Sequence, residues 1–381
     1  MTDLLPQPGL LFSIASFIAM IAVLVVVHEG GHYLAGRMFG VKVDAFAVGF
    51  GKELFGFDDR RGTRWKINLI PLGGYVKFTG DMNAASQPSP EVLAMPAHER
   101  ANLFVSKPLW QKAIIVAAGP VINFVFAILI LAGFYLALGH PSTPPVISAV
   151  APAGAAAKAG IMAGDRILKI DGTGISRFED IPGLVLTGNG APMTVTLQRG
   201  GAVRTISVTP RMVETTDRFG QTSRHGQLGV MRSGEQVTEP VGPVKALMYG
   251  VTDTGDIITA IARTMKQVIL GERSLDEMGG PIKSGQVTGQ QASQGLLSFI
   301  AFMAFFSINL GFINLIPIPV LDGGHLLLYA IEAVRRQPVG AKVQEWAFMS
   351  GFAALMSMMA ILTWNDLGSV GVWKQLAGWL N

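Results

Sequence analysis

The sequence His28-Glu29-Gly30-Gly31-His32 stands at the end of a run, residues 4–27, that contains no charged side chain. Residues four apart in a helix lie one turn apart on the same face, so the two imidazoles can bind one zinc ion. Glu29 lies between them and can act as the general base that takes a proton from zinc-bound water. Ionisable side chains are costly at the end of an apolar run of membrane length, which indicates a functional site. The pattern is short enough to arise by chance, but its context predicts a metalloprotease with its zinc inside a membrane.

The composition of the 381-residue chain is that of a membrane protein. Half of the residues are hydrophobic and 15% are charged, whereas about a quarter are charged in soluble domains. The net charge of +4 is mild and no block of Lys and Arg is present, which argues against a nucleic acid partner. The chain has no cysteine, so disulfides, thiolate zinc ligands and cysteine catalysis are excluded. A metal must therefore be held by histidine and carboxylate side chains.

Four segments reach the length of about 20 apolar residues that a membrane-spanning helix requires. They are residues 4–27, continuing as helix toward residue 39, then residues 113–138, 296–321 and 346–365. The first has no basic residue ahead of it and no cleavage site before the histidines, so we expect a retained span rather than a signal peptide. A further segment, residues 244–270, is predicted to be an amphipathic helix lying on the membrane or on the protein. Its charged residues include Asp253, Asp256, Arg263 and Lys266.

The distribution of basic residues predicts the orientation. The loop between the first two spans is rich in Lys and Arg, and the loop between the third and fourth carries Arg335, Arg336 and Lys342. The positive-inside rule then places both loops in the cytoplasm and both termini outside. The long region between the second and third spans is expected outside as well, since long domains cross the membrane largely regardless of charge.

The first cytoplasmic loop is predicted to contain a β-hairpin. Residues 45–51 and 64–78 have β-type composition and are punctuated by glycine and proline. An ordinary soluble hairpin fits these residues as well as a hairpin that lies against the membrane beside the zinc. In the second case its edge could pair with an unwound substrate as an extra strand. The edge residues would be Tyr75, Val76, Lys77 and Phe78. Residues 81–100, rich in Pro, Ser, Ala and Glu, are expected to form a mobile linker.

The region after the second span begins with a small, mostly β domain. Its expected elements are a strand at 146–150, a helical stretch at 152–161, a Gly-Asp turn at 164–165 and strands at 193–199 and 203–209. This order resembles a bacterial PDZ domain over residues 145–212, whose groove would hold an extended chain end by strand addition. One such unit is visible, and no internal repeat is found.

A catalytic zinc site uses three protein ligands and a water molecule, so one ligand is missing from the first motif. A metzincin pattern is excluded because Ala35 and Met38 stand where glycine and histidine are required. The best candidate lies in the sequence Asn314-Leu315-Ile316-Pro317-Ile318-Pro319-Val320-Leu321-Asp322-Gly323-Gly324-His325. Its prolines break the third span, and Asp322 lies at the break. Asp322 is either the third zinc ligand or an ordinary aspartate at a helix terminus in the membrane interface. Spans one and three run in the same direction, so the histidines and Asp322 are expected at matching depth.

The two sequences together resemble the site-2 protease family of intramembrane zinc proteases, and more closely its bacterial regulator-of-sigma-E protease branch. Further matching stretches are Gly49-Phe50-Gly51-Lys52, Pro71-Leu72-Gly73-Gly74-Tyr75-Val76-Lys77 and Gly119-Pro120 with Asn123. The resemblance covers nearly the whole chain. The best-known members carry two PDZ units, so the single unit here leaves open how substrates are screened.

The resemblance implies roles for particular residues. His28, His32 and Asp322 would bind Zn²⁺, and Glu29 would be the general base. The expected substrate-binding residues are Asn314, beside the zinc, Pro317 and Pro319, which shape the cleft, and the edge residues Tyr75, Val76, Lys77 and Phe78. Asn123 either makes a packing hydrogen bond between helices or takes a direct part in the site. His325 either orients a ligand or lies at the interface, and the second is what we expect.

Four glycines near the first motif predict close helix packing. Each of them disfavours helix by about 1 kcal/mol relative to alanine, so close packing on that face of the helix is the expected reason for their presence. They are Gly30, Gly31, Gly36 and Gly40.

The expected fold class is an α-helical polytopic membrane protein with four transmembrane helices, a membrane-associated β-hairpin and an inserted, mostly β, PDZ-like domain. In chain order we expect the first span at 1–39, the hairpin region and linker at 40–107, the second span at 108–139, the PDZ-like domain at 145–212, a linker with the amphipathic helix at 213–290, the third span at 291–325 and the fourth span with a tail at 346–381.

The function expected from the resemblance is intramembrane zinc proteolysis in a bacterial inner membrane. The family's usual substrates are single-span membrane proteins of the anti-sigma-factor type and remnant signal peptides. The lipid bilayer is the other expected partner, and no nucleic acid partner is expected. The alternative is a non-catalytic PDZ-type membrane scaffold that binds chain ends, although such a scaffold would have no use for Glu29. A transporter would show internal repeats, and none is visible.

Overall fold

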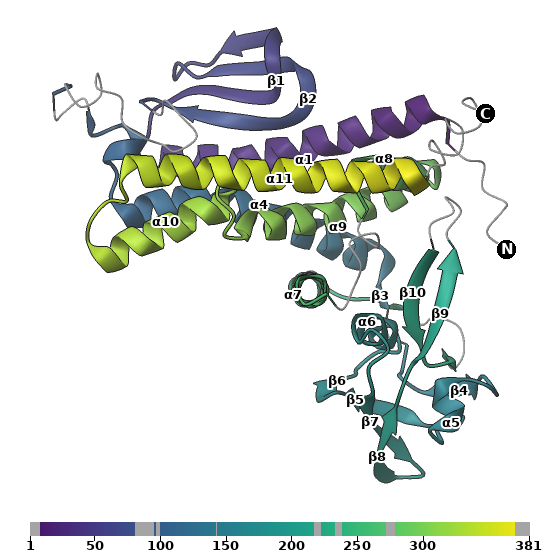
Figure 1. Ribbon diagram of the computed structural model, residues 1–381. Helices are drawn as coiled ribbons and strands as arrows, with labels where there is room; N and C mark the ends of the chain where they lie inside the picture. The colour runs from purple at the N-terminus through teal and green to yellow at the C-terminus, as the bar shows by residue number, and fades with distance from the viewer. Residues whose placement is uncertain are drawn as a thin grey trace, which may run out of the picture. The chain divides into compact units, whose positions relative to one another are not determined.

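The computed structural model describes residues 8–80, 95–96, 100–141, 143–216, 222–232, 238–271 and 279–369 (Figure 1). Nearly all of the predicted linker at 81–100, and the tail after residue 369, lie outside the described residues. The chain forms two compact units. The helical unit comprises residues 1–130 and 279–366, and the sheet-rich unit comprises residues 131–278 and 367–381.

Within the described ranges, four helices are long and apolar enough to cross a membrane: α1 (Leu10–Met38), α4 (Leu109–Leu138), α9 (Leu296–Leu315) and α11 (Ala341–Ser369). The four predicted spans are therefore present as apolar helices. The third ends earlier than predicted, at Leu315 rather than residue 321, because Pro317 and Pro319 have no N–H to continue the helix. The segment that follows starts a separate helix, α10 (Asp322–Arg335).

A further helix, α8 (Pro281–Ser293), was not predicted. Its sequence is polar and rich in small residues, so it lacks the apolar periodicity that would have marked it. It packs closely on α1, since a Cβ atom at Gly289 would overlap the side chain of Ser13. Small residues thus allow a polar helix to lie against an apolar one at short range.

The glycines of α1 divide into two kinds. A Cβ at Gly31 would overlap the carbonyl oxygen of Ala118 on α4, and one at Gly36 would lie 2.5 Å from the ring of Phe78. The predicted close packing is therefore observed at these two positions. It is wrong for Gly30 and Gly40, which have open space around them. Gly40 follows the helix with a φ of +69°, a conformation that glycine adopts without strain.

The β-hairpin consists of β1 (Val43–Asp58) and β2 (Arg64–Phe78), which form an antiparallel ladder along α1 (Figure 1). The register brings residues 45–48 beside both 64–67 and 74–77, so the first half of β1 lies between the two halves of β2. Among the described residues, the stretch 74–78 pairs with β1 on one side alone. The predicted edge strand is thus the outer strand of this sheet.

The hairpin turn is tied to the end of α1. Asp59 accepts backbone N–H bonds from Arg61 and Thr63 through Oδ1, while its Oδ2 accepts from Tyr33 and Trp65. Asp59 therefore stabilises the turn between β1 and β2 and holds this turn against Tyr33 of α1.

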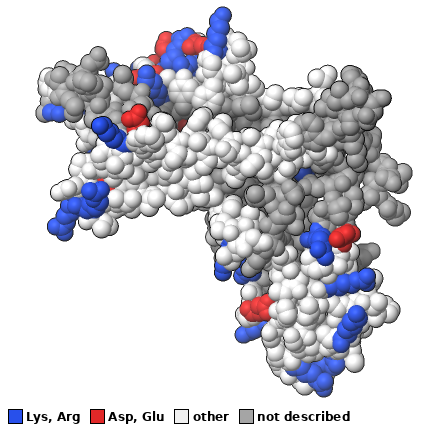
Figure 2. All heavy atoms as spheres, in the orientation of Figure 1, with Lys and Arg blue, Asp and Glu red and all other residues white. Residues whose placement is uncertain are grey.

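Large apolar side chains are exposed on both the hairpin and the helices of the helical unit. On the hairpin they are Phe50, Leu54, Phe55, Phe57, Ile67, Leu69 and Ile70. Figure 2 shows charged side chains over the hairpin and at one end of this unit, with a broad uncharged surface between them. Apolar patches of this extent mark surfaces that contact lipid or protein.

The sheet-rich unit contains a four-stranded sheet in the order β6-β5-β7-β8. Its elements are β4 (Ile147–Val150), α5 (Ala155–Lys158), β5 (Arg166–Ile170), β6 (Thr173–Gly174), α6 (Asp180–Thr187), β7 (Met193–Arg199), β8 (Ala202–Val208), β9 (Arg211–Thr216), β10 (Thr222–Gln227) and β11 (Val230–Arg232). One core of buried aliphatic residues joins these elements, including Ile147, Ile170, Val195 and Leu197. Because β11 pairs with β4, the domain continues to residue 232, beyond the expected boundary at 212.

A buried ion pair stabilises this domain. Asp165 has no exposed surface, and its carboxylate oxygens both lie 2.7 Å from guanidinium nitrogens of Arg199. The hydrogen bonds from Arg199 hold the pKa of Asp165 below its usual range.

A second polar cluster joins the domain to α7 (Pro243–Ile269), the amphipathic helix expected at 244–270. The guanidinium of Arg177 lies 3.0 Å from Oδ1 of Asp253 on α7 and 2.7 Å from Nε2 of His140. His140 stacks on Tyr249 with ring centroids 3.7 Å apart, and Tyr135 at the end of α4 donates to Asp253. Burial, followed by the charge of Arg177, lowers the pKa of His140.

Candidate metal centre and active site

The helical unit brings the three predicted metal ligands together. Nε2 of His28 lies 3.3 Å from Nε2 of His32, and Oδ2 of Asp322 lies 3.2 Å and 3.5 Å from these two nitrogens. Helix α1 places the two imidazoles one turn apart, with their rings at 85° to each other. Asp322 is the first residue of α10, directly after the break that the two prolines cause.

These atoms fit a zinc ion. Ligand atoms at about 2.0–2.1 Å from a tetrahedral zinc are separated by about 3.3 Å from one another. The three observed separations of 3.2, 3.3 and 3.5 Å agree with that spacing. Oδ2 of Asp322 is buried and receives no hydrogen bond from the described residues, although two imidazole nitrogens lie beside it. A cation between the three groups would satisfy this oxygen.

Each imidazole is held from behind by a group on α4. Nδ1 of His32 lies 2.9 Å from the carbonyl oxygen of Ile115 and must be the donor, which leaves Nε2 unprotonated toward the site. Nδ1 of His28 lies 3.0 Å from Nδ2 of Asn123, a fully buried residue whose Oδ1 has no donor among the described residues. Rotating this amide by 180° would let Oδ1 accept the Nδ1 proton of His28, and the Nε2 lone pair would then face the metal.

Gly119 on α4 makes room for both rings. A Cβ atom at this position would overlap Nε2 of His32 and lie 2.9 Å from Cε1 of His28. Glycine is therefore required by the approach of α4 to the metal-binding face of α1, in agreement with its place in the quoted Gly119-Pro120 motif.

Glu29 and the predicted ligands line one cavity of about 290 Å³. Of the predicted substrate-binding residues, Asn314, Tyr75, Val76 and Phe78 also line it, whereas Lys77, Pro317 and Pro319 do not. Six lining residues were not among the predicted site residues: Gly74, Phe104, Ile115, Val116, Val320 and His325. His325 belongs to the quoted stretch 314–325, but nothing in the sequence placed Phe104 near the site.

The end of β2 is packed against the catalytic motif. A Cβ at Gly74 would lie 3.3 Å from Cγ of Glu29 and 2.6 Å from the carbonyl oxygen of Ala47. The backbone amide of Val76 is within hydrogen-bonding reach of the Glu29 carboxylate. The outer strand of the hairpin therefore forms one wall of the cavity.

The loop between α9 and α10 forms another part of the wall. Val320 has a φ of +99°, which is strained for a β-branched residue and is found where surrounding contacts impose it. Gly323, Gly324 and Gly351 allow these contacts, because a Cβ at each would overlap backbone oxygens of residues 315–319. The strained loop delivers Asp322 to the histidines.

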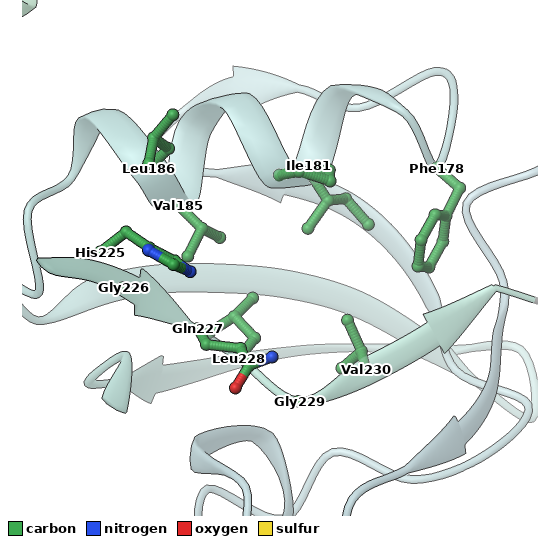
Figure 3. A pocket seen from close by; sticks show the side chains of 11 residues that line it. Phe178, Ile181, Val185, Leu186, His225, Gly226, Gln227, Leu228, Gly229 and Val230 are labelled. Carbon is green, nitrogen blue, oxygen red and sulfur yellow. The ribbon is translucent and has the colours of Figure 1, made fainter. Parts of the chain in front are cut away.

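A second cavity, of about 330 Å³, lies in the sheet-rich unit between α6 and the chain around β10 and β11 (Figure 3). Phe178, Ile181 and Val185 point into it from one side, and Leu228 and Val230 from the other (Figure 3). It is a mostly apolar groove beside a strand.

An apolar helical protein with this His-Glu-His and Asp cavity belongs to the class of membrane metalloproteases. The profile of Peptidase family M50 matches residues 16–358, so the chain belongs to Peptidase family M50, the site-2 protease family. A protein of Agrobacterium fabrum is 43% identical over 94% of this chain and 96% of its own length, and one of Rhizobium meliloti is 42% identical over 94% and 97%. Both bear the name "putative zinc metalloprotease". "Metalloprotease MmpA" of Caulobacter vibrioides is 35% identical over 97% of this chain and 99% of its length.

These relationships confirm the predicted class of enzyme. The chain is a zinc metalloprotease, its metal is Zn²⁺, and it is a multi-pass membrane protein that acts on protein substrates in a lipid bilayer. The alternative of a non-catalytic scaffold is thereby rejected.

Proposed function

We propose that this enzyme is an intramembrane endopeptidase in which His28, His32 and Asp322 hold the zinc and Glu29 is the general base. The observation that carries the proposal is the cavity in which a carboxylate, two imidazoles and Asp322 meet among helices of membrane length. Bound zinc would polarise the scissile carbonyl and lower the pKa of a water molecule bound to the zinc. Glu29 would take the proton of the attacking water and pass it to the nitrogen of the leaving amine.

The substrates we propose are single-span membrane proteins of the anti-sigma-factor type and remnant signal peptides. A transmembrane helix hides its peptide bonds in internal hydrogen bonds, so it must unwind before it is cut. The outer strand at 74–78 supports this proposal, since it is unpaired on one side among the described residues and adjoins Glu29. An unwound segment would pair with this strand as an extra strand, with Asn314 near the reacting bond.

The groove of the sheet-rich unit is proposed to be PDZ-like and to bind a chain end. Its apolar side chains lie beside a strand, as a site for strand addition requires. In the proposed orientation this unit is periplasmic, the cavity faces the cytoplasmic side, and the membrane is the bacterial inner membrane. A reporter fused after Gln337 is expected to score as cytoplasmic, and a periplasmic signal would contradict the orientation.

The test of the catalytic proposal is cleavage of a single-span substrate by the purified full-length protein in lipid vesicles. Glu29→Gln is expected to reduce kcat by about 10²–10⁴-fold with zinc retained, because the base is lost and the ligands are not. Glu345→Gln, at an exposed position of α11, is the matched control and should cleave as the wild type does. Wild-type cleavage by Glu29→Gln would contradict the mechanism.

Contact between substrate and the outer strand can be tested separately. The chain has no cysteine, so a single cysteine at Tyr75 or Lys77 can be cross-linked to a cysteine in the substrate without background. Cross-links are expected from the strand and not from a control cysteine at Lys342. Equal yields from the control position would contradict the clamp.

A further inference from the structure

His325 lines the catalytic cavity, and neither the metal site nor the base requires it. It lies on α10 three residues after Asp322, so both side chains are on the same face of the helix, one turn apart. Asp322, Glu29 and His325 line the same cavity. A side chain in this position faces the space that a bound peptide would fill.

The ring of His325 is held by aromatic neighbours. Its centroid lies 4.9 Å from the ring of Phe348 on α11 and 6.3 Å from that of Tyr329 on α10. No hydrogen bond or ion pair to its ring nitrogens is found among the described residues. A phenyl ring would provide the same packing without the cost of an unsatisfied polar group. The ring N–H is therefore available to a ligand in the cavity.

Few other side chains in the cavity can donate a hydrogen bond to substrate. One N–H of Asn314 Nδ2 donates to the carbonyl oxygen of Leu310 at 3.0 Å, which leaves its second N–H. His28 and His32 direct their Nε2 atoms to the metal position. Tyr75, His325 and the second N–H of Asn314 remain. Of these, His325 lies on the same helix as Asp322.

We propose that His325 is a catalytic residue whose neutral imidazole N–H donates a hydrogen bond to the scissile carbonyl oxygen as negative charge develops there. This inference rests on the proposed intramembrane proteolysis. Water oxygen bonds to the carbonyl carbon, the bond from that carbon to nitrogen breaks, and the proton moves through Glu29 to the amine. His325 keeps its proton throughout. A fixed donor at a developing oxyanion acts on the transition state more than on the bound substrate.

The experiment compares His325→Phe, His325→Gln and Tyr75→Phe in the purified full-length protein. His325→Phe keeps the ring contacts and removes the donor, and we expect kcat to fall by about 10²–10³-fold, with KM nearly unchanged. His325→Gln keeps an N–H donor and should retain more of kcat. Zinc content should match the wild type in all three, since none is a proposed ligand. A wild-type kcat in His325→Phe would overturn the proposal, whether or not kcat falls in Tyr75→Phe. Loss of zinc from His325→Phe would also overturn it.

A binding measurement separates this proposal from the proposed function. A phosphinic peptide carries the negative oxygen of the transition state, and its affinity can be measured by calorimetry without turnover. His325→Phe should lose affinity for the phosphinic peptide by about the same factor as kcat and bind the ordinary peptide nearly as the wild type does. Unchanged phosphinic affinity would overturn the role of His325 whether or not the wild type cleaves. Failure of the wild type to cleave, with this difference intact, would count against the proposed substrate class alone.

Discussion

The side-chain amide of Asn123 on α4 lies 3.0 Å from Nδ1 of His28 on α1. From the sequence alone, Asn123 could make a packing hydrogen bond between helices or take a direct part in the site. In the structure Asn123 is fully buried and lies behind a predicted metal ligand. His32 is held in the same way by the carbonyl oxygen of Ile115. The proposed metal centre is therefore shaped by two helices together, because α1 supplies the imidazoles and α4 contacts them from behind.

Replacing Asn123 by leucine should weaken zinc binding by about 10–100-fold, which is the usual effect of removing a partner behind a metal-binding histidine. Competition with a chelator on the purified protein would measure it. Asn309→Leu is the matched control, since the side chain of Asn309 donates to the carbonyl oxygen of Phe305 in its own helix. Equal zinc affinity in both variants would show that Asn123 is a packing residue.

Replacing Asp322 by alanine should remove most of the bound zinc while the fold persists. Two histidines alone leave a catalytic zinc with one protein ligand too few. Metal content after dialysis, compared with that of His325→Gln on the same helix, would measure the loss. An Asp322→Ala protein with a full zinc complement would remove this residue from the site.

Gly119→Ala and Gly30→Ala should differ sharply. A Cβ at position 119 would overlap His32, so we expect loss of zinc and of activity. Gly30 has open space, and alanine there should favour the helix by about 1 kcal/mol and leave zinc binding intact. Zinc content and thermal unfolding of the two proteins would test this. Normal zinc content in Gly119→Ala would mean that α4 can move away from the histidines at little cost.

The Asp165–Arg199 pair predicts how the sheet-rich unit responds to acid. Arg199 lowers the pKa of the folded Asp165, whereas in the unfolded chain this pKa is about 3.9. The unfolded state therefore binds the proton more readily, so the pair's contribution is present above about pH 4 and is lost as pH falls through the folded pKa. The hydrogen-exchange protection factors of β5 and β7 in the full-length protein, which are corrected for the intrinsic exchange rate at each pH, should fall over that range.

The same pair gives a mutational test. Arg199→Met should destabilise the unit at pH 7, because it leaves a buried carboxylate without its partner. The difference should shrink at low pH, where a protonated Asp165 no longer needs the guanidinium. Arg211→Met, at an exposed position of β9, is the control. A difference that is independent of pH would mean that Arg199 acts through packing rather than charge.

Several elements could be predicted because local chemistry decides them. The four apolar helices follow from runs of hydrophobic residues, and the amphipathic helix expected at 244–270 is found at Pro243–Ile269. Helix α8 was not predicted because it is stabilised by contact with α1 and its sequence has no apolar helical periodicity. The pairing of β11 with β4 also had no local signal, since it joins residues some 80 positions apart in the sequence.

The sequence by itself determined the class of enzyme and its chemical groups: a His-Glu-His motif on an apolar helix, an aspartate after a proline break, and no cysteine to compete as ligand. These depend on residue type and spacing along one chain. Only the tertiary structure decided that Asn123 and Ile115 hold the imidazoles, that Gly119 must lack a side chain and that His325 faces the cavity. Such relationships join residues from 83 positions apart, as for His32 and Ile115, to 296 positions apart, as for Glu29 and His325. They depend on how closely the helices approach. No pattern of neighbouring residues in the sequence specifies the distance between two packed helices.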